Sequence, residues 1–113
     1  MNLADLYAAP QDDADYQRFS FANADSHEQV LGAIFKQKNG LRLPSYVLDP
    51  ISLNDFDAWL WRHQDAHTAI NEALGLTGND LTDLDPKDRN QLEYWAILHF
   101  NEHNNWAQKL GIS

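Results

Sequence analysis

Residues 59–76, WLWRHQDAHTAINEALGL, recur 36 positions later as residues 95–112, WAILHFNEHNNWAQKLGI. The two copies share the pattern Trp-x3-His-x3-His-x6-Leu-Gly-aliphatic. Side chains four residues apart lie on one face of a helix, so each copy predicts a helix that carries Trp, two His and Leu along one stripe. The Leu-Gly-aliphatic ending is typical of a helix that stops at a left-handed glycine.

A weaker third copy lies upstream, at residues 19–34, where Phe replaces Trp and Asn replaces the first His. Three helices that each carry this stripe predict a three-helix bundle packed around a common axis. The centre of the stripe is polar in all three copies. All five histidines of the chain lie there, together with one asparagine: His27, His63, His67, His99, His103 and Asn23.

The expected fold class is therefore all-α. We expect one helical-bundle domain over residues 13–113, preceded by an N-terminal arm over residues 1–12. The elements of the domain are helices at about residues 13–38, 53–74 and 86–110 and an irregular apolar connector at residues 41–51. Prolines within that connector are incompatible with a regular helix.

Helix ends and helix direction are also open to prediction. Ser52 and Asp55 have the spacing of a capping box, and Asp85 before Pro86 is typical of an N-cap. Helices joined by short connectors usually pack antiparallel, so we expect the second helix to run opposite to the other two. That reversal brings His63 level with His27 and His103, and His67 level with Asn23 and His99.

Composition and charge restrict the function classes. The 113 residues are 43% hydrophobic and 12% aromatic, as in a globular domain. A net charge of −9 and a pI near 4.7 disfavour direct binding to nucleic-acid phosphates. No apolar run reaches the roughly 18 residues of a membrane span, and no N-terminal signal peptide is visible. We expect no membrane partner and no secretion by a signal peptide.

The buried imidazoles need hydrogen-bond partners or a ligand for both ring nitrogens, and three arrangements remain open. One is a hydrogen-bonded network with Asn23 and trapped water. Another is a zinc or iron ion bound by the five histidines, with Asn23 as a polar neighbour. In the third, one edge of the stripe faces solvent. Asp57, Glu93 and Glu102 turn to the helix flanks by helical phase and are expected at the solvated surface.

Other signals are fewer. Leu3, Leu6 and Tyr7 in the arm could form one amphipathic turn, which is either a frayed terminus or a segment that docks onto a neighbouring subunit. No nucleophile–base pair, zinc-protease pattern or phosphate loop is visible, so the residues do not support an enzyme.

Several short motifs, spread over residues 19–112, resemble small acidic proteins encoded among the virion genes of tailed bacteriophages. They are Phe21-Ala22-Asn23-Ala24 leading to His27, Leu48-Asp49-Pro50-Ile51, Trp59-Leu60 with His63-Gln64 and His67, Asn79-Asp80-Leu81, and Trp95, His99 and His103 with Leu110-Gly111-Ile112. The resemblance implies a virion-associated structural protein, a head or tail accessory protein located in the virion or the host cytoplasm. Its partners would be other virion proteins or further copies of itself.

Two alternatives to this function are kept. One is a His-ligated metal-binding helical protein that holds zinc or iron. The other is an inhibitor of a host enzyme that mimics nucleic acid through acidic residues at 12–15 and 80–88.

Overall fold

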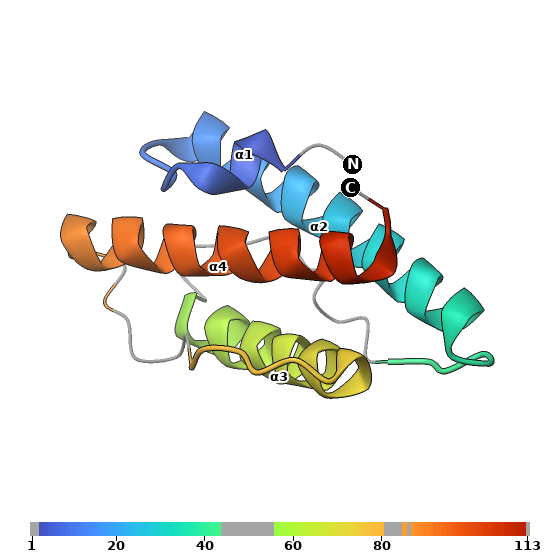
Figure 1. Cartoon of the computed structure of the whole chain (residues 1–113). Coiled ribbons are helices and arrows are strands. Elements are labelled where there is room, and N and C mark those ends of the chain that lie inside the picture. Colours follow the sequence, from blue (N-terminus) through green and yellow to red (C-terminus); the bar gives the residue numbers. More distant parts are fainter. Residues whose placement is uncertain (1–2, 44–55, 81–84, 86, 113) are drawn as a thin grey trace.

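The computed structural model describes residues 3–43, 56–80, 85 and 87–112, with the side chains of residues 56 and 57 left out of the description. The described part is all-helical, and no strand occurs in it (Figure 1). It contains the helices α1 (Ala4–Tyr7), α2 (Asp13–Gln37), α3 (Phe56–Leu74) and α4 (Arg89–Leu110). The predicted all-α fold with three long helices is confirmed.

Helix ends agree with the prediction at most positions. Leu74 and Leu110 end α3 and α4 as expected. The glycines that follow them, Gly75 and Gly111, have φ angles of 68° and 72°, which an L side chain rarely adopts. The backbone N–H of Leu76 donates to the carbonyl of Asn71 at 2.8 Å, which is the closing bond of a Schellman motif.

The start of α4 was predicted wrongly. The helix begins at Arg89, and Asp88 is its N-cap, with a side chain that accepts from the backbone N–H groups of Asn90 and Gln91. Asp85 instead closes a turn, because its side chain accepts from the backbone N–H of Lys87. The predicted capping box at Ser52 and Asp55 lies outside the described residues.

The predicted antiparallel arrangement is wrong, because α2, α3 and α4 all run in the same direction. Figure 1 shows the N-terminal ends of the three helices on one side of the molecule and their C-terminal ends on the other. The contacts agree: Phe19, Trp59 and Trp95, near the helix starts, pack in one apolar cluster. Leu74 and Leu110, at the ends of α3 and α4, pack in a second cluster.

The connections between the helices are long enough to permit this direction. Residues 75–88 can span up to about 46 Å when extended, which exceeds the roughly 33 Å length of a 22-residue helix such as α4. Residues 38–55 are more numerous still. Each connection is therefore long enough to return to the start of the bundle, and the rule for short connectors does not apply.

Parallel helices bring sequence-equivalent residues of the three copies together in layers, as around an approximate threefold axis. Two apolar clusters lie at the ends of the core and the polar residues lie between them. From helix starts to helix ends the layers are Phe19, Trp59 and Trp95; then Asn23, His63 and His99; then His27, His67 and His103; then Val30, Ile70 and Trp106; then Ile34, Leu74 and Leu110.

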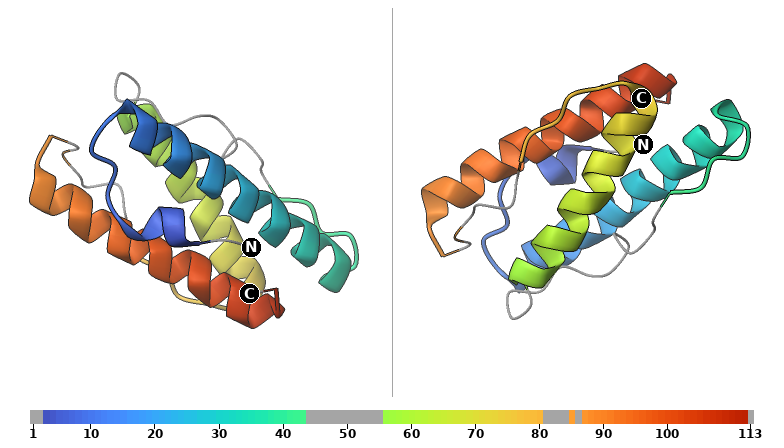
Figure 2. Two further views of the ribbon diagram at one scale, coloured as in Figure 1. Left: turned by 90° about the horizontal axis from the view of Figure 1, so that it is seen from above. Right: turned by 90° about the horizontal axis from the view of Figure 1, so that it is seen from below.

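The N-terminal arm packs onto its own chain. Helix α1 contacts α2 and α4, and both views of Figure 2 place it beside these helices. Leu6 is fully buried in the cluster that contains Phe19 and Trp95, and Leu3 packs at the edge of that cluster. Tyr7 stays 59% exposed and meets Phe100 edge to face. The arm is thus an ordered part of the bundle, which neither sequence interpretation described.

Candidate metal centre

The two polar layers form one buried cluster of five imidazoles. Each histidine has a relative exposure of 1% or less, and Asn23 has 2%. One ring nitrogen from each histidine lies within 4.8 Å of the corresponding nitrogens of the other four. The solvent-facing arrangement is therefore wrong, and the sequence prediction that all five histidines gather in one place is confirmed.

His63 is the hub of the cluster. Its Nε2 atom lies 3.2 Å from Nε2 of His27, 3.0 Å from Nε2 of His67 and 3.2 Å from Nε2 of His99. The Oδ1 atom of Asn23 lies 3.3 Å from the same nitrogen. Four polar atoms from three helices thus surround a single ring nitrogen.

Hydrogen bonding alone does not satisfy this hub. The Nε2 atom of an imidazole carries either one hydrogen or one in-plane lone pair, so it can be matched to one neighbour well, not to four. A second short contact, 3.1 Å between Nε2 of His99 and Nε2 of His103, adds a further nitrogen pair that must share a hydrogen or place two lone pairs face to face. A cation at the point where these nitrogens converge would match all of them at once.

Tryptophan rings close the cluster at both ends. The ring of Trp59 stacks on His63 with centroids 4.4 Å apart, and that of Trp95 stacks on His99 at 4.8 Å. At the other end the ring of Trp106 lies 4.4 Å from that of His67. The imidazoles therefore lie in an apolar box that excludes bulk water, which strengthens any charge interaction inside it.

In the layer formed by His27, His67 and His103, the outer ring nitrogen of each histidine is Nδ1, and the partners of these nitrogens follow one rule. Each partner is the residue immediately before the histidine of the same layer on the next helix. The Oε1 atom of Glu102, before His103, lies 3.2 Å from Nδ1 of His67. Ser26, before His27, is 2.7 Å from Nδ1 of His103.

The third position under this rule is Ala66, before His67, and it offers no polar atom. The Nδ1 atom of His27 accordingly has no hydrogen-bond partner within the described part of the chain. The approximate threefold arrangement thus explains both the two satisfied nitrogens and the unsatisfied one.

Glu102 was predicted to be a solvated flank residue, and that prediction is wrong. It is only 4% exposed because the flank of α4 on which it lies faces α3. Besides His67, it accepts a hydrogen bond from Nδ2 of Asn71 at 2.9 Å, and Trp106 donates to Asn71 at 2.7 Å. Glu93, by contrast, is an exposed partner of Arg89 as expected. The side chain of Asp57 lies outside the described residues.

The protonation states suit metal binding. Burial lowers the pKa of His27 to about 3. Burial, and after it the neighbouring imidazoles, hold the pKa of His63, His67, His99 and His103 well below the usual 6.5. The five rings are therefore neutral at pH 7, which is the form that binds a metal.

The contact between His67 and Glu102 fixes one tautomer. Burial raises the pKa of Glu102, and hydrogen bonds from Asn71 and Asn79 oppose that rise. An ionised carboxylate can only accept hydrogen bonds, so with Glu102 ionised the ring hydrogen of His67 is on Nδ1 and the lone pair of Nε2 points into the cluster. Carboxylate–histidine pairs of this kind orient metal ligands and raise their basicity.

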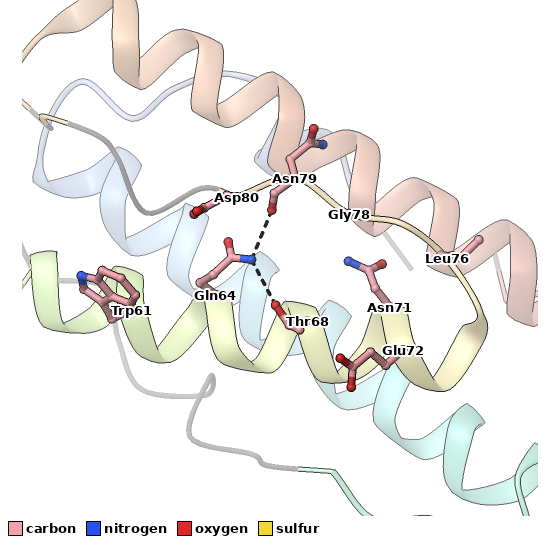
Figure 3. Close-up of a pocket in the computed structure, with 9 residues that line it drawn as sticks. All are labelled: Trp61, Gln64, Thr68, Asn71, Glu72, Leu76, Gly78, Asn79 and Asp80. Carbon is pink, nitrogen blue, oxygen red and sulfur yellow. Dashed lines mark hydrogen bonds between the residues drawn. The ribbon is translucent and has the colours of Figure 1, made fainter.

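Glu102 also connects the cluster to a surface pocket of about 380 Å³ between α3 and residues 76–80. Figure 3 shows Asn71 and Gln64 facing this segment, with the Gln64 amide bonded to Thr68 and to the carbonyl of Asn79. A Cβ on Gly78 would lie 2.1 Å from Nδ2 of Asn71, so glycine permits the close approach. The sequence did not single out this pocket, whose lining residues are mostly uncharged and lack a motif.

Fold and site together define a parallel three-helix bundle with a buried five-histidine cluster. No model of a protein family, no curated protein and no solved structure matches this chain. Among the described helices, none combines the length and apolar character that crossing a membrane requires.

Proposed function

We propose that this protein is a histidine-ligated metal protein that holds one transition-metal ion in the core of its helical bundle. The observation that carries the proposal is the convergence of four polar atoms within 3.0–3.3 Å of Nε2 of His63. Such a set is costly without a cation, because buried polar groups that lack matched partners cost about 1–3 kcal/mol each.

The spacing of the nitrogens fits coordination to one ion. Metal–nitrogen bonds of about 2.1 Å place neighbouring ligand atoms about 3.0 Å apart around an octahedral ion and about 3.4 Å apart around a tetrahedral ion. The contacts made by Nε2 of His63 lie between these values. Each vertex of a tetrahedron has three neighbours and each vertex of an octahedron has four, so the number of neighbours favours octahedral coordination.

This geometry favours iron over zinc among the two expected ions. Structural zinc sites are almost always four-coordinate, whereas six positions suit ions such as Fe²⁺, Co²⁺ and Ni²⁺, for which imidazole is also a suitable ligand. Thiolate ligands are excluded because the chain has no cysteine.

Metal analysis of untagged protein tests the proposal. Metal-free protein is incubated either with Fe²⁺ under anaerobic conditions or with Zn²⁺. Excess ion is removed by gel filtration, and the metal content per chain is measured by inductively coupled plasma mass spectrometry. We expect about one Fe²⁺ per chain. Because an ion that binds only the folded state stabilises it, the thermal unfolding midpoint should rise on loading.

Two variants distinguish metal binding by the histidine cluster from metal binding at the protein surface. His63→Ala removes the hub and should abolish stoichiometric binding. Asp65→Asn, at an exposed position of the same helix, should bind as the wild type does. Circular dichroism checks that both variants fold. Metal content far below one ion per chain in wild-type protein, with no change in its unfolding midpoint, would refute the proposal whatever the variants do.

The virion setting is a second proposal, supported by the motif resemblance described above. It concerns where the protein acts and is compatible with a metal centre. Mass spectrometry of purified particles tests it: the protein should be recovered with the virion, and its recovery only from infected cytoplasm would count against a virion role. The nucleic-acid-mimic alternative has less support, because Asp12 and Asp88 serve as helix N-caps.

A further inference from the structure

We propose that the metal centre keeps one exchangeable coordination position, at Asn23, where a small exogenous ligand of two or three heavy atoms binds opposite His67. This inference rests on the proposed metal binding and deepens it. An exchangeable position would let the ion bind a small molecule from solution, so the metal centre would have a ligand-binding role in addition to stabilising the fold.

The six side chains of the two polar layers supply the six positions of one octahedral ion. Within the two layers the five histidines contribute nitrogens, and Asn23 contributes an amide oxygen. Nε2 of His63 has short contacts to His27, His67, His99 and Asn23. These are the four neighbours of an octahedral vertex.

The opposite vertices follow from the same contacts. His103 makes no short contact with His63 among the described interactions, so His103 takes the vertex opposite His63. Rotation about the approximate threefold axis carries α2 to α3 and α3 to α4. Applied to that pair, the rotation places Asn23 opposite His67 and His99 opposite His27. The short contact of His99 with His103 agrees, because those two vertices are neighbours.

Asn23 is the weakest of the six donors. It stands where the second and third helices have histidine, and it offers a neutral amide oxygen to a site otherwise made of imidazole nitrogens. Imidazole is the better ligand for late first-row ions, while amide carbonyls suit harder ions. The bond to Asn23 is therefore the one that an outside ligand displaces most readily.

The surroundings restrict the size of that ligand. Phe19, Trp59 and Trp95 form the adjacent layer, and each is at most 3% exposed. A ligand must therefore fit in the space that an asparagine amide vacates when it swings aside. Azide, with three heavy atoms, and nitric oxide, with two, meet this condition, whereas a metabolite with a carbon skeleton does not.

The ligand opposite Asn23 differs from the other four. Within the described part of the chain, His67 is the one histidine whose outer nitrogen lies at hydrogen-bond distance from a carboxylate, at 3.2 Å from Oε1 of Glu102. Such a pairing makes the imidazole a stronger donor. Electron density donated along the axis from His67 would reach whatever molecule is bound in place of Asn23.

The test uses Co²⁺ as the metal, since its visible absorption responds to coordination, and azide as the probe ligand. Azide titrated into Co²⁺-loaded wild-type protein should change the spectrum saturably. Asn23→Ala removes the competing amide and should bind azide about tenfold more tightly, equivalent to about 1.4 kcal/mol. Asn23→His supplies a sixth imidazole and should keep Co²⁺ but lose the azide response.

The outcomes separate the two proposals. Failure of wild-type protein to bind Co²⁺ would overturn the metal proposal and this one together. Co²⁺ bound at one ion per chain, with no azide response in either wild type or Asn23→Ala, would overturn the exchangeable position alone. An azide response in Asn23→His equal to that of wild type would also overturn it. If Asn23→His does not fold, the comparison of Asn23→Ala with wild type still decides the matter.

Discussion

At the scale of single residues, the site is governed by what precedes each histidine of the second polar layer. Glu102 bonds to His67 and Ser26 to His103, while Ala66 leaves Nδ1 of His27 without a partner among the described residues. A metal ligand is held in place by the group that bonds its other nitrogen. The orientation of His27 therefore depends on packing and on the contact of its Nε2 with Nε2 of His63 at 3.2 Å.

The first prediction concerns Ala66. In Ala66→Ser the new hydroxyl would stand toward His27 as that of Ser26 stands toward His103, at 2.7 Å. Loss of such outer partners typically lowers metal affinity 10–100-fold, so the gain of one should raise the affinity about tenfold. Isothermal titration of metal-free wild type, Ala66→Ser and the matched removal variant Ser26→Ala measures this. Unchanged affinity in both variants would show that the outer partners do not position the ligands.

At the scale of elements, the inward positions of each helix follow a 4-4-3-4 spacing, as in Trp59, His63, His67, Ile70 and Leu74. The repeating unit of this spacing, 4-4-3, covers eleven residues in three turns, which corresponds to about 3.67 residues per turn. That value is close to the 3.6 of a straight helix. Equivalent residues therefore stay level through all five layers without strong supercoiling, which is what places two polar triangles directly above one another.

The short helix α1 carries the second prediction. Leu6 is fully buried where α1 packs against α2 and α4. Leu6→Ala should therefore destabilise the protein by about 2–5 kcal/mol, as for other buried leucines. Tyr7→Ala is the matched control, because Tyr7 is 59% exposed and its aromatic contact with Phe100 is worth at most about 1.5 kcal/mol. Urea unfolding of the two variants gives both values. Equal, small losses would mean that the arm does not pack on its own chain in solution.

At the scale of the whole molecule, the histidine cluster makes stability depend on pH. The folded-state pKa values of all five histidines lie below 6.5, so the unfolded chain binds more protons than the folded chain in mildly acidic solution. Stability is then complete above the unfolded pKa and falls as pH drops through about 6.5 toward the folded values.

The third prediction is acid unfolding of the metal-free protein. Between pH 7.5 and pH 5.5 a histidine that stays neutral in the folded chain lowers the free energy of unfolding by about 1 kcal/mol, so the five together remove several kcal/mol, on the order of 5. That is comparable with the whole stability of a small domain, about 5–15 kcal/mol. Urea melts at pH 7.5, 6.5 and 5.5 should show a steep loss of stability, and a bound ion should move the loss to lower pH because protons compete for the same nitrogens. Equal stability at all three pH values would contradict the buried, neutral cluster.

Much of this architecture was predictable from the sequence, because it depends on local rules. Helical phase alone places the five histidines on inward stripes together with Trp59, Trp95 and Trp106, and the glycine after Leu74 and after Leu110 predicts the ends of two helices. The prediction that the histidines form a candidate metal site rests on that phase and on the repeat of Trp-x3-His-x3-His.

Only the tertiary structure decided which side chains face one another. Helix direction depends on how a long connection returns, which local propensity does not encode, and the parallel direction is what brings Asn23 level with His63 rather than with His67. Glu102 lies on a flank by helical phase, and that flank becomes part of the site only because α3 covers it. A stripe is a property of one helix, whereas a binding site is a property of three helices whose relative direction and rotation are set by packing.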